Sequence, residues 1–258
     1  MKADRIFSVA GRVALVTGAS SGLGNRFARV LAANGAAVVC VARRADRLAA
    51  LVQEIEASGG KALAIGADVS DRGAMTAAFD AAEKAFGTVT ILVNNAGIGL
   101  AGRVVDQPDS IWRDTMSVNL DAVYFNAQEA ARRMMAAGKP GAIVNIASIL
   151  GFGVGKGLSA YAVSKAAVVQ LTKALAIELG RAKIRVNALA PGYFVTEINA
   201  DHLSQHGDAM KKDIPLGHFG AEGDLDGPLL LLASEAGAFV HGATYVVDGG
   251  QMIGLRGS

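Results

Sequence analysis

Four polar residues of this chain have the types and spacing of an acid/base site: Asn119, Ser148, Tyr161 and Lys165. Tyr161 and Lys165 are four positions apart, so in a helix both side chains lie on one face. An ammonium group beside a phenol favours the phenolate and lowers the tyrosine pKa from about 10. We therefore expect Tyr161 to exchange a proton with a ligand. Taken singly, each residue also fits an ordinary role as a cap, strand end, half-buried aromatic or surface charge.

A glycine-rich turn near the N-terminus has the features of a nucleotide site. Residues 12–17 form a predicted strand, Gly18-Ala19-Ser20-Ser21-Gly22-Leu23-Gly24 follows, and the apolar spacing of Phe27, Val30 and Leu31 predicts a helix. Glycines let the backbone approach a pyrophosphate, and a helix N-terminus offers free N–H groups. The spacing G-x-x-x-G-x-G differs from the commoner G-x-G-x-x-G fingerprint. A plain turn is the alternative interpretation.

The order of these motifs resembles that of the short-chain dehydrogenases/reductases, and the resemblance extends from about Gly11 to Gly250. It implies an oxidoreductase that interconverts a carbonyl and a secondary alcohol by hydride transfer with a nicotinamide cofactor. The motifs that carry the resemblance are Thr17-Gly18-Ala19-Ser20-Ser21-Gly22-Leu23-Gly24, Asn94-Asn95-Ala96-Gly97, Asn119, Ser148, Tyr161-x-x-x-Lys165 and Pro191-Gly192.

The resemblance also implies a role for each of the four polar residues. Tyr161 is the acid/base, and Ser148 hydrogen-bonds the substrate oxygen and stabilises the charge that develops on it. Lys165 lowers the tyrosine pKa and hydrogen-bonds the nicotinamide ribose. Asn119 is expected to hold a water that links Lys165 to solvent.

The residues after the second predicted strand bear on the choice of cofactor. Strand 36–41 is followed by Arg43 and Arg44, without an acid at the expected position. Guanidinium groups suit the 2′-phosphate of NADP(H), which we favour, while NAD(H) stays open. Solvated charges at the start of a helix are the alternative. Ser20 and Ser21 stand where many NADP-dependent relatives carry a basic residue. The resemblance adds as cofactor contacts Asp68, Val69, Asn95, Ala96, Gly97, Tyr161, Lys165, Pro191, Gly192, Phe194 and Thr196, although Asp68 could instead cap the following helix.

Two segments are expected to form the walls of a substrate site, one between Ser148 and Tyr161 and one at about 193–217. The glycine-rich stretch 151–157 in the first segment is either a flexible wall or loop filler. Segments at the position of the second one often act as mobile lids over substrate. Its Lys211 and Lys212 could meet an anion, and we assign no role to its histidines.

The chain resembles both 3-oxoacyl-thioester reductases and sugar or secondary-alcohol dehydrogenases. A catalytically silent dinucleotide sensor is the non-enzymatic alternative, against which the four polar residues argue.

Strand and helix patterns alternate along the chain, which predicts a single α/β domain over residues 1–258. We expect a Rossmann-type doubly wound parallel sheet of about seven strands with helices on both faces, a three-layer sandwich. Right-handed crossovers then place the carboxyl ends of the strands, with their motifs, along one edge. Expected strands are 12–17, 36–41, 61–65, 89–93, one that ends near Ser148, 184–188 and 244–247; expected helices are 46–57, one capped by Ser70 that ends at Phe86, 109–137 with a break near 117–119, 161–179 and 225–232.

Composition narrows the possible classes. Hydrophobic residues make up 52% of the 258 residues and charged residues 19%, which argues against disorder. A net charge of +2 favours neither nucleic acid nor a membrane surface, and we find no apolar run long enough to span a membrane. The single cysteine, Cys40, is expected to be buried, and the lack of a disulfide suits the cytoplasm. Four histidines and one cysteine offer no metal-ligand spacing.

By resemblance we expect a homotetramer, or a dimer, built through the long helices and the C-terminal strand.

Overall fold

The computed structural model describes residues 2–195 and 207–253. Within these residues seven strands form one sheet in the order β3-β2-β1-β4-β5-β6-β7, and each neighbouring pair is parallel. The predicted Rossmann-type sheet is therefore confirmed. The strands are β1 (Val13–Thr17), β2 (Ala37–Ala42), β3 (Lys61–Gly66), β4 (Ile91–Asn94), β5 (Gly141–Ile146), β6 (Ile184–Pro191) and β7 (Thr244–Val247).

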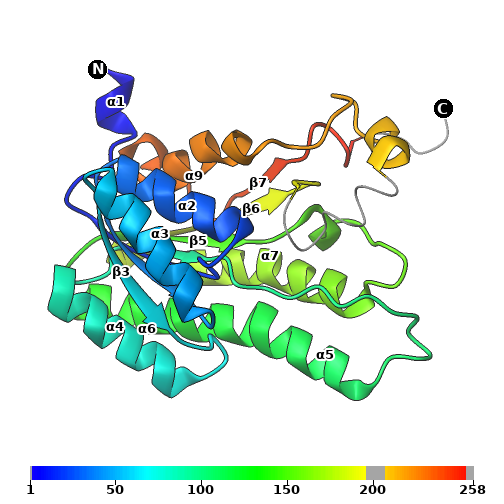
Figure 1. The fold of residues 1–258 in the computed structure, drawn as a ribbon, viewed down its shortest axis with the longest axis horizontal. Helices are drawn as coiled ribbons and strands as arrows, with labels where there is room; N and C mark the ends of the chain where they lie inside the picture. Colours follow the sequence, from blue (N-terminus) through cyan, green and yellow to red (C-terminus); the bar gives the residue numbers. More distant parts are fainter. Residues whose placement is uncertain (1, 196–206, 254–258) are drawn as a thin grey trace.

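Helices cover both faces of the sheet, which gives three layers (Figure 1). One face carries α2 (Gly22–Ala33), α3 (Ala45–Ala57) and α9 (Asp226–Ala233). The other face carries α4 (Arg72–Phe86), α5 (Asp109–Met116), α6 (Ala122–Ala136) and α7 (Ser159–Leu179). A short N-terminal helix, α1 (Ala3–Ile6), was not predicted, and none of its residues is buried.

The side chains of β1 show why these strands are apolar throughout. Ala14 and Val16 belong to the core under α2, α3 and α9, whereas Val13 and Leu15 belong to the core under α4, α6 and α7. Successive side chains of a strand point to opposite faces, so a strand that is covered on both faces needs apolar residues at every position.

Two of the element boundaries that differ from the prediction have a clear cause. Ser70 is not the cap of α4, because its hydroxyl donates to Asp68 Oδ1 at 2.6 Å. Asp71 is the cap instead, and its side chain accepts from the N–H of Ala74 at 3.0 Å. Strand β6 runs to Pro191, past the predicted end at 188, because its last residues pair with β7.

The helical segment between β4 and β5 is interrupted where a break was predicted. A π-helical turn, Ser117–Asp121, joins α5 to α6. Such turns widen the helix by one residue and are frequent at functional sites. Asn119 lies in this turn and is completely buried.

Three further observations complete the fold. Cys40 is buried in β2, and burial raises the pKa of its thiol to about 12. None of the helices in the described ranges has both the length and the apolar character of a membrane span. Of the expected substrate segment at 193–217, residues 196–206, which include Thr196, lie outside the described residues; a helix at 207–212 follows them.

Candidate active site

The parallel sheet brings the sequence motifs to one edge. Gly18 follows β1, Asn95 follows β4, Ser148 follows β5 and Pro191 ends β6. All four strands run in the same direction, so their carboxyl ends share this edge. In open α/β sheets, ligands bind in the crevice outside such strand ends.

Ser148 and Tyr161 contact each other above the end of β5. Ser148 begins a 3₁₀ turn, Ile149–Gly151, and its hydroxyl accepts from the N–H of Leu150 at 3.1 Å. A side-chain hydrogen bond joins the Ser148 hydroxyl to the Tyr161 phenol. Burial raises the pKa of Tyr161 above 10, and the hydrogen bond from Ser148 opposes this rise only in part. The expected lowering of the tyrosine pKa is therefore wrong for the protein without cofactor, because desolvation outweighs the neighbouring groups.

Lys165 lies one helical turn beyond Tyr161 on α7 and is 4% exposed. Its ammonium group donates to the backbone oxygen of Ile146 at 2.8 Å and lies 5.6 Å from the centre of the Tyr161 ring. Burial lowers the pKa of Lys165 to about 8. The group therefore loses its charge only slightly above neutral pH.

Asn119 connects the π-helical turn to the strand end and to α7. Its Oδ1 accepts from the N–H of Ile98 at 2.8 Å, and its Nδ2 donates to Ile98 O at 2.9 Å and to Ser164 Oγ at 3.1 Å. A Cβ added at Gly97 would lie 3.3 Å from Asn119 Oδ1 and 3.5 Å from Lys165 Nζ. Gly97 thus lies next to both Asn119 and Lys165, with little room for a larger side chain on the Asn119 side. The water expected between Lys165 and solvent stays a prediction.

The glycine-rich turn is held by two polar side chains from β1 and the β4 end. Thr17 Oγ1 accepts from the N–H groups of Asn95 and Ala96, each at 3.0 Å. Asn95 Nδ2 donates back to Thr17 O at 3.0 Å. A Cβ at Gly24 would lie 2.4 Å from both Gly18 O and Asn95 Nδ2, so only glycine fits there. Thr17 and the Asn95 side chain therefore position the turn, a role that the sequence analysis did not assign.

The start of α2 and the end of β2 fit a phosphorylated dinucleotide. Ser21 precedes α2 without a side-chain cap, and no acid lies in the first turn, so its N–H groups face a region suited to a pyrophosphate. Arg44 Nη2 donates to Ser20 Oγ at 3.0 Å and to Ser21 Oγ at 2.6 Å. The guanidinium thus lies over the turn, where a 2′-phosphate would need a cation. Asp68 has its pKa lowered, first by hydrogen bonds from Ser70 and then by the charge of Arg43.

The remaining expected cofactor residues border this crevice or lie in the core. The N–H of Gly192 donates to Val247 O at 2.9 Å. Phe194 is 5% exposed and packs on Gly220, so its side chain belongs to the core. Val69, next to Asp68, is likewise buried.

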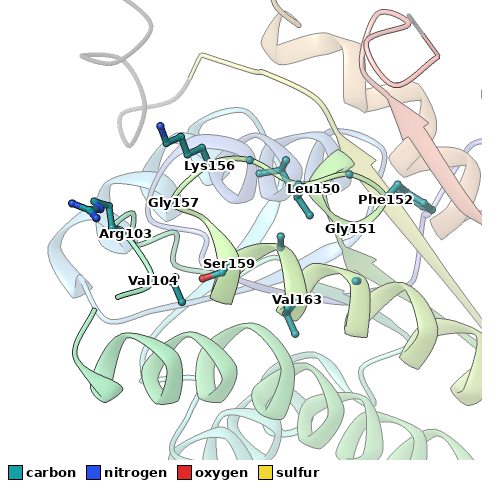
Figure 2. Close-up of a pocket in the computed structure, with 15 residues that line it drawn as sticks. Arg103, Val104, Leu150, Gly151, Phe152, Lys156, Gly157, Ser159 and Val163 are labelled. Atoms are coloured by element: carbon teal, nitrogen blue, oxygen red, sulfur yellow. The ribbon is translucent and has the colours of Figure 1, made fainter. Parts of the chain in front are cut away.

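A pocket of about 670 Å³ has none of Asn119, Ser148, Tyr161 and Lys165, the candidate cluster, among its lining residues. Figure 2 shows Leu150 and Lys156 on the loop and Val163 on the facing helix α7. Tyr161 and Lys165 share a different face of α7 from Val163, so the pocket and the cluster are on separate sides of the helix. The lining residues are Gly102, Arg103, Val104, Leu150, Gly151, Phe152, Gly153, Val154, Gly155, Lys156, Gly157, Ser159, Ala162, Val163 and Ala166.

The cluster as a whole can move a proton to or from a ligand oxygen. A phenol and a hydroxyl are hydrogen-bonded to each other, and a buried amine lies behind the phenol. The expected position of the nicotinamide, past the glycine-rich turn, is along the same strand ends. Proton transfer coupled to hydride transfer is the chemistry that this arrangement allows.

Comparison with known proteins gives concordant results. A sequence model of the family described as short chain dehydrogenase matches residues 12–207. The L-rhamnose 1-dehydrogenase (NAD(P)(+)) of Azotobacter vinelandii is 40% identical over 251 residues, 95% of this chain and 98% of that protein. The gluconate 5-dehydrogenase of Gluconobacter oxydans is 39% identical over 252 residues, 97% and 98% of the two chains. A crystal structure of a gluconate 5-dehydrogenase from Burkholderia cenocepacia in complex with NADP and tartrate has a TM-score of 0.94 and 38% identity, and covers 98% of this chain and 100% of that one.

These matches agree with the choice of cofactor made from Arg43 and Arg44. NADP(H) is the favoured cofactor, with NAD(H) as the alternative. The parallel sheet and the order of the motifs agree with the family match. The chain therefore belongs to the short-chain dehydrogenase/reductase family.

Proposed function

We propose that this protein oxidises a hydroxyl group of a sugar, a sugar acid or a polyol, with NADP⁺ as the hydride acceptor. As a family member it is an NAD(P)-dependent oxidoreductase that interconverts a carbonyl and a secondary alcohol. The observation that carries the substrate class is the identity of 40% and 39%, over almost the whole chain, to dehydrogenases of L-rhamnose and gluconate.

In the proposed mechanism, Tyr161 accepts the proton of the substrate hydroxyl during oxidation and returns it during reduction. Ser148 Oγ hydrogen-bonds the same oxygen and stabilises the charge that develops on it. The nicotinamide ring supplies hydride transfer when the cofactor is bound. Ser148 and Tyr161 are already hydrogen-bonded, so one substrate oxygen can contact both groups.

Lys165 lies behind the phenol of Tyr161, with its ammonium group 5.6 Å from the centre of the ring. We assign to Lys165 the hydrogen bond to the nicotinamide ribose. Its amine carries a charge for this contact as long as the pH stays below its pKa of about 8. We further assign to Asn119 the task of fixing the Ile98 backbone and the Ser164 hydroxyl around this pair.

The adenosine end of the cofactor is assigned to the glycine-rich turn, to Arg43 and Arg44, and to Asp68. Arg44 already bridges Ser20 and Ser21, and the hydroxyls and the guanidinium together form a donor set for a phosphate. The N–H groups at the start of α2 would hold the pyrophosphate.

A substrate panel tests the proposed function. Purified protein would be assayed for NADP⁺ and NAD⁺ reduction with gluconate, L-rhamnose, galactitol and a simple secondary alcohol, and for NADPH oxidation with a 3-oxoacyl thioester. We expect turnover of at least one polyhydroxylated compound, with kcat/KM at least tenfold above that of the simple alcohol. A preference for the thioester, or cofactor binding without turnover of any compound, would refute the assignment.

We also propose a homotetramer in which helix α7 packs against other copies. This helix leaves large apolar side chains exposed, and exposed apolar patches mark interaction surfaces. Val163 and Ile177 are 46% and 86% exposed on α7, and Trp112 of α5 is 48% exposed. The pocket of Figure 2 opens beside the same helix. Light scattering should give four times the mass of the chain, and the mass of a single chain would refute the tetramer.

Two broader assignments complete the proposal. Residues 1–258 are taken as one domain, in which the segment at about 193–217 forms part of the substrate wall. The protein is placed in the cytoplasm, because its single thiol is buried and no disulfide can form within the chain. Cell fractionation would check the location, and limited proteolysis that released a stable fragment would contradict the single domain.

A further inference from the structure

A turn at the C-terminal end of β7 is fixed by one carboxylate. Asp248 Oδ1 accepts from the N–H of Gly250 at 2.9 Å, and Oδ2 accepts from the N–H of Met252 at 2.7 Å. The same residue abuts Gly192, where an added Cβ would lie 2.7 Å from Asp248 Cβ. The turn at 248–253 is therefore anchored beside the Pro191–Gly192 segment, at the edge of the sheet that carries the catalytic cluster.

One side of this turn contacts the segment 214–216. The N–H of Leu216 donates to Gly249 O at 3.1 Å. A Cβ at Gly249 would lie 2.7 Å from Ile214 Cγ2, and Gly249 has a φ of +66°, so glycine is required on both counts. Ile214 is 3% exposed. In Figure 1 the red segment after β7 lies beside the orange segment that precedes α9.

The other side of the turn contacts the loop that joins Ser148 to Tyr161. The Met252 side chain packs on Gly153, with its Cε 3.5 Å and its Sδ 3.7 Å from the position of an added Cβ. The N–H of Gly153 donates to Ile149 O at 3.0 Å, inside the 3₁₀ turn that Ser148 begins. Met252 is thus two contacts away from the hydroxyl that is assigned to the substrate oxygen.

We propose that Met252 is a positioning residue for substrate, because it fixes the 151–157 loop against the 214–216 segment through the turn at 248–253. The unbranched thioether of methionine adapts its shape to irregular gaps between packed segments. The loop follows β5 and the segment follows β6 along the chain. The effect on substrate affinity rests on the proposed function; the effect on the loop does not.

The test compares Met252→Ala with Met252→Leu and with Ile253→Ala, the neighbouring residue, which is 86% exposed. Hydrogen exchange of peptides that cover 150–157 and 214–217 is measured in the protein without cofactor. NADP⁺ affinity, kcat and KM are measured with the best substrate of the panel. We expect faster exchange in both peptides and a KM raised about tenfold in Met252→Ala, with kcat and NADP⁺ affinity within about twofold of the wild type.

Met252→Leu should restore both exchange and KM, and Ile253→Ala should match the wild type. Asp248→Asn, which removes one of the two carboxylate acceptors, should speed exchange in the same peptides. Unchanged exchange in Met252→Ala, an equal effect of Ile253→Ala, or losses of kcat and NADP⁺ affinity as large as the rise in KM would overturn the proposal. If the wild type turns over no compound of the panel, the proposed function fails, and the exchange experiment still decides the role of Met252.

Discussion

The two ends of the cofactor crevice are built on opposite physical principles. At the catalytic end, Lys165 and Asn119 are 4% and 0% exposed, and burial is the largest influence on the pKa values of both Tyr161 and Lys165. At the adenosine end, Arg43 and Arg44 are exposed, and their charges remain in contact with water. Desolvation and fixed hydrogen bonds dominate at the first end, and exposed charge dominates at the second.

This difference decides how each end responds to its surroundings. Buried groups are screened little by salt but respond strongly to pH, since desolvation has shifted their pKa values. Exposed cations keep their charge over the whole physiological pH range and are screened by salt. Changes at the catalytic end should therefore affect turnover and stability, and changes at the adenosine end should affect affinity and its salt dependence.

The largest effect is expected for Tyr161→Phe. Removal of the phenol oxygen removes the proton acceptor, and kcat should fall by about 10²–10⁴-fold. NADP⁺ affinity, measured by fluorescence titration, should change less than threefold, because the ring itself remains. Tyr245→Phe, in β7, serves as the control. Near-normal turnover in Tyr161→Phe would refute the assignment of Tyr161 as the acid/base.

Lys165→Met should lose activity and gain stability. In the wild type the pKa of Lys165 is about 8, below the value of 10.5 for a free lysine. Between these two pH values the unfolded chain therefore binds more protons than the folded chain. The free energy of unfolding of the wild type therefore rises as the pH increases through this window, and the full penalty of roughly 3 kcal/mol applies below pH 8.

Thermal unfolding of Lys165→Met and the wild type would be compared at pH 7 and above pH 10.5. Loss of the hydrogen bond to Ile146 O offsets part of the stabilisation. We therefore expect the free energy of unfolding of the variant to exceed that of the wild type by roughly 1–3 kcal/mol at pH 7, and to show no increase above pH 10.5. A variant that is less stable than the wild type at pH 7 would contradict the dominance of burial at this end.

Arg44→Ala should affect the other end alone. Loss of a charged donor set should weaken NADP⁺ binding by about 10–100-fold and leave NAD⁺ binding within about threefold. The difference between the two cofactors should shrink as salt is raised from 0.05 to about 0.5 M. Isothermal titration of both cofactors measures this, with Arg132→Ala on α6 as the control. Equal losses for both cofactors would assign Arg44 to the structure of the turn and not to a 2′-phosphate.

Thr17→Val tests the junction between the two ends. Thr17 is 1% exposed and accepts from two backbone N–H groups, so valine should cost about 1–3 kcal/mol of unfolding free energy. Thr115→Val is a matched control, since Thr115 is also buried but its hydroxyl has no hydrogen-bond partner in the part of the chain that the structure describes. Chemical denaturation should show Thr115→Val to be neutral or stabilising. An equal loss of unfolding free energy in the two variants would refute the positioning role of Thr17.

The alternation of strands and helices made the fold predictable, because the sheet is covered on both faces and each strand is apolar at every position. Boundaries were less predictable where side chains compete. Ser70 has the chemistry of a cap, but its hydroxyl bonds to Asp68, and Asp71 caps the helix instead. Asn119, Ser148, Tyr161 and Lys165 could be listed in advance as site candidates because their types and order are distinctive, and their catalytic roles stay a prediction.

Contacts between distant segments were beyond the reach of sequence patterns. Thr17 and Asn95 are 78 positions apart and hold the glycine-rich turn together. The Met252 contact to Gly153 joins the end of the chain to the loop before α7. No local periodicity carries information about such pairs, since they depend on how crossovers place the strand ends.

The sequence by itself determined the parallel sheet, the reaction class and the preference for NADP(H), because each depends on residue types in a fixed order. The tertiary structure decided the protonation of the site. The spacing of Tyr161 and Lys165 predicted a lowered tyrosine pKa, yet in the folded chain burial raises it and lowers that of Lys165 to about 8. Spacing along a helix fixes which groups are neighbours, whereas the depth at which the fold buries them sets the cost of their charges.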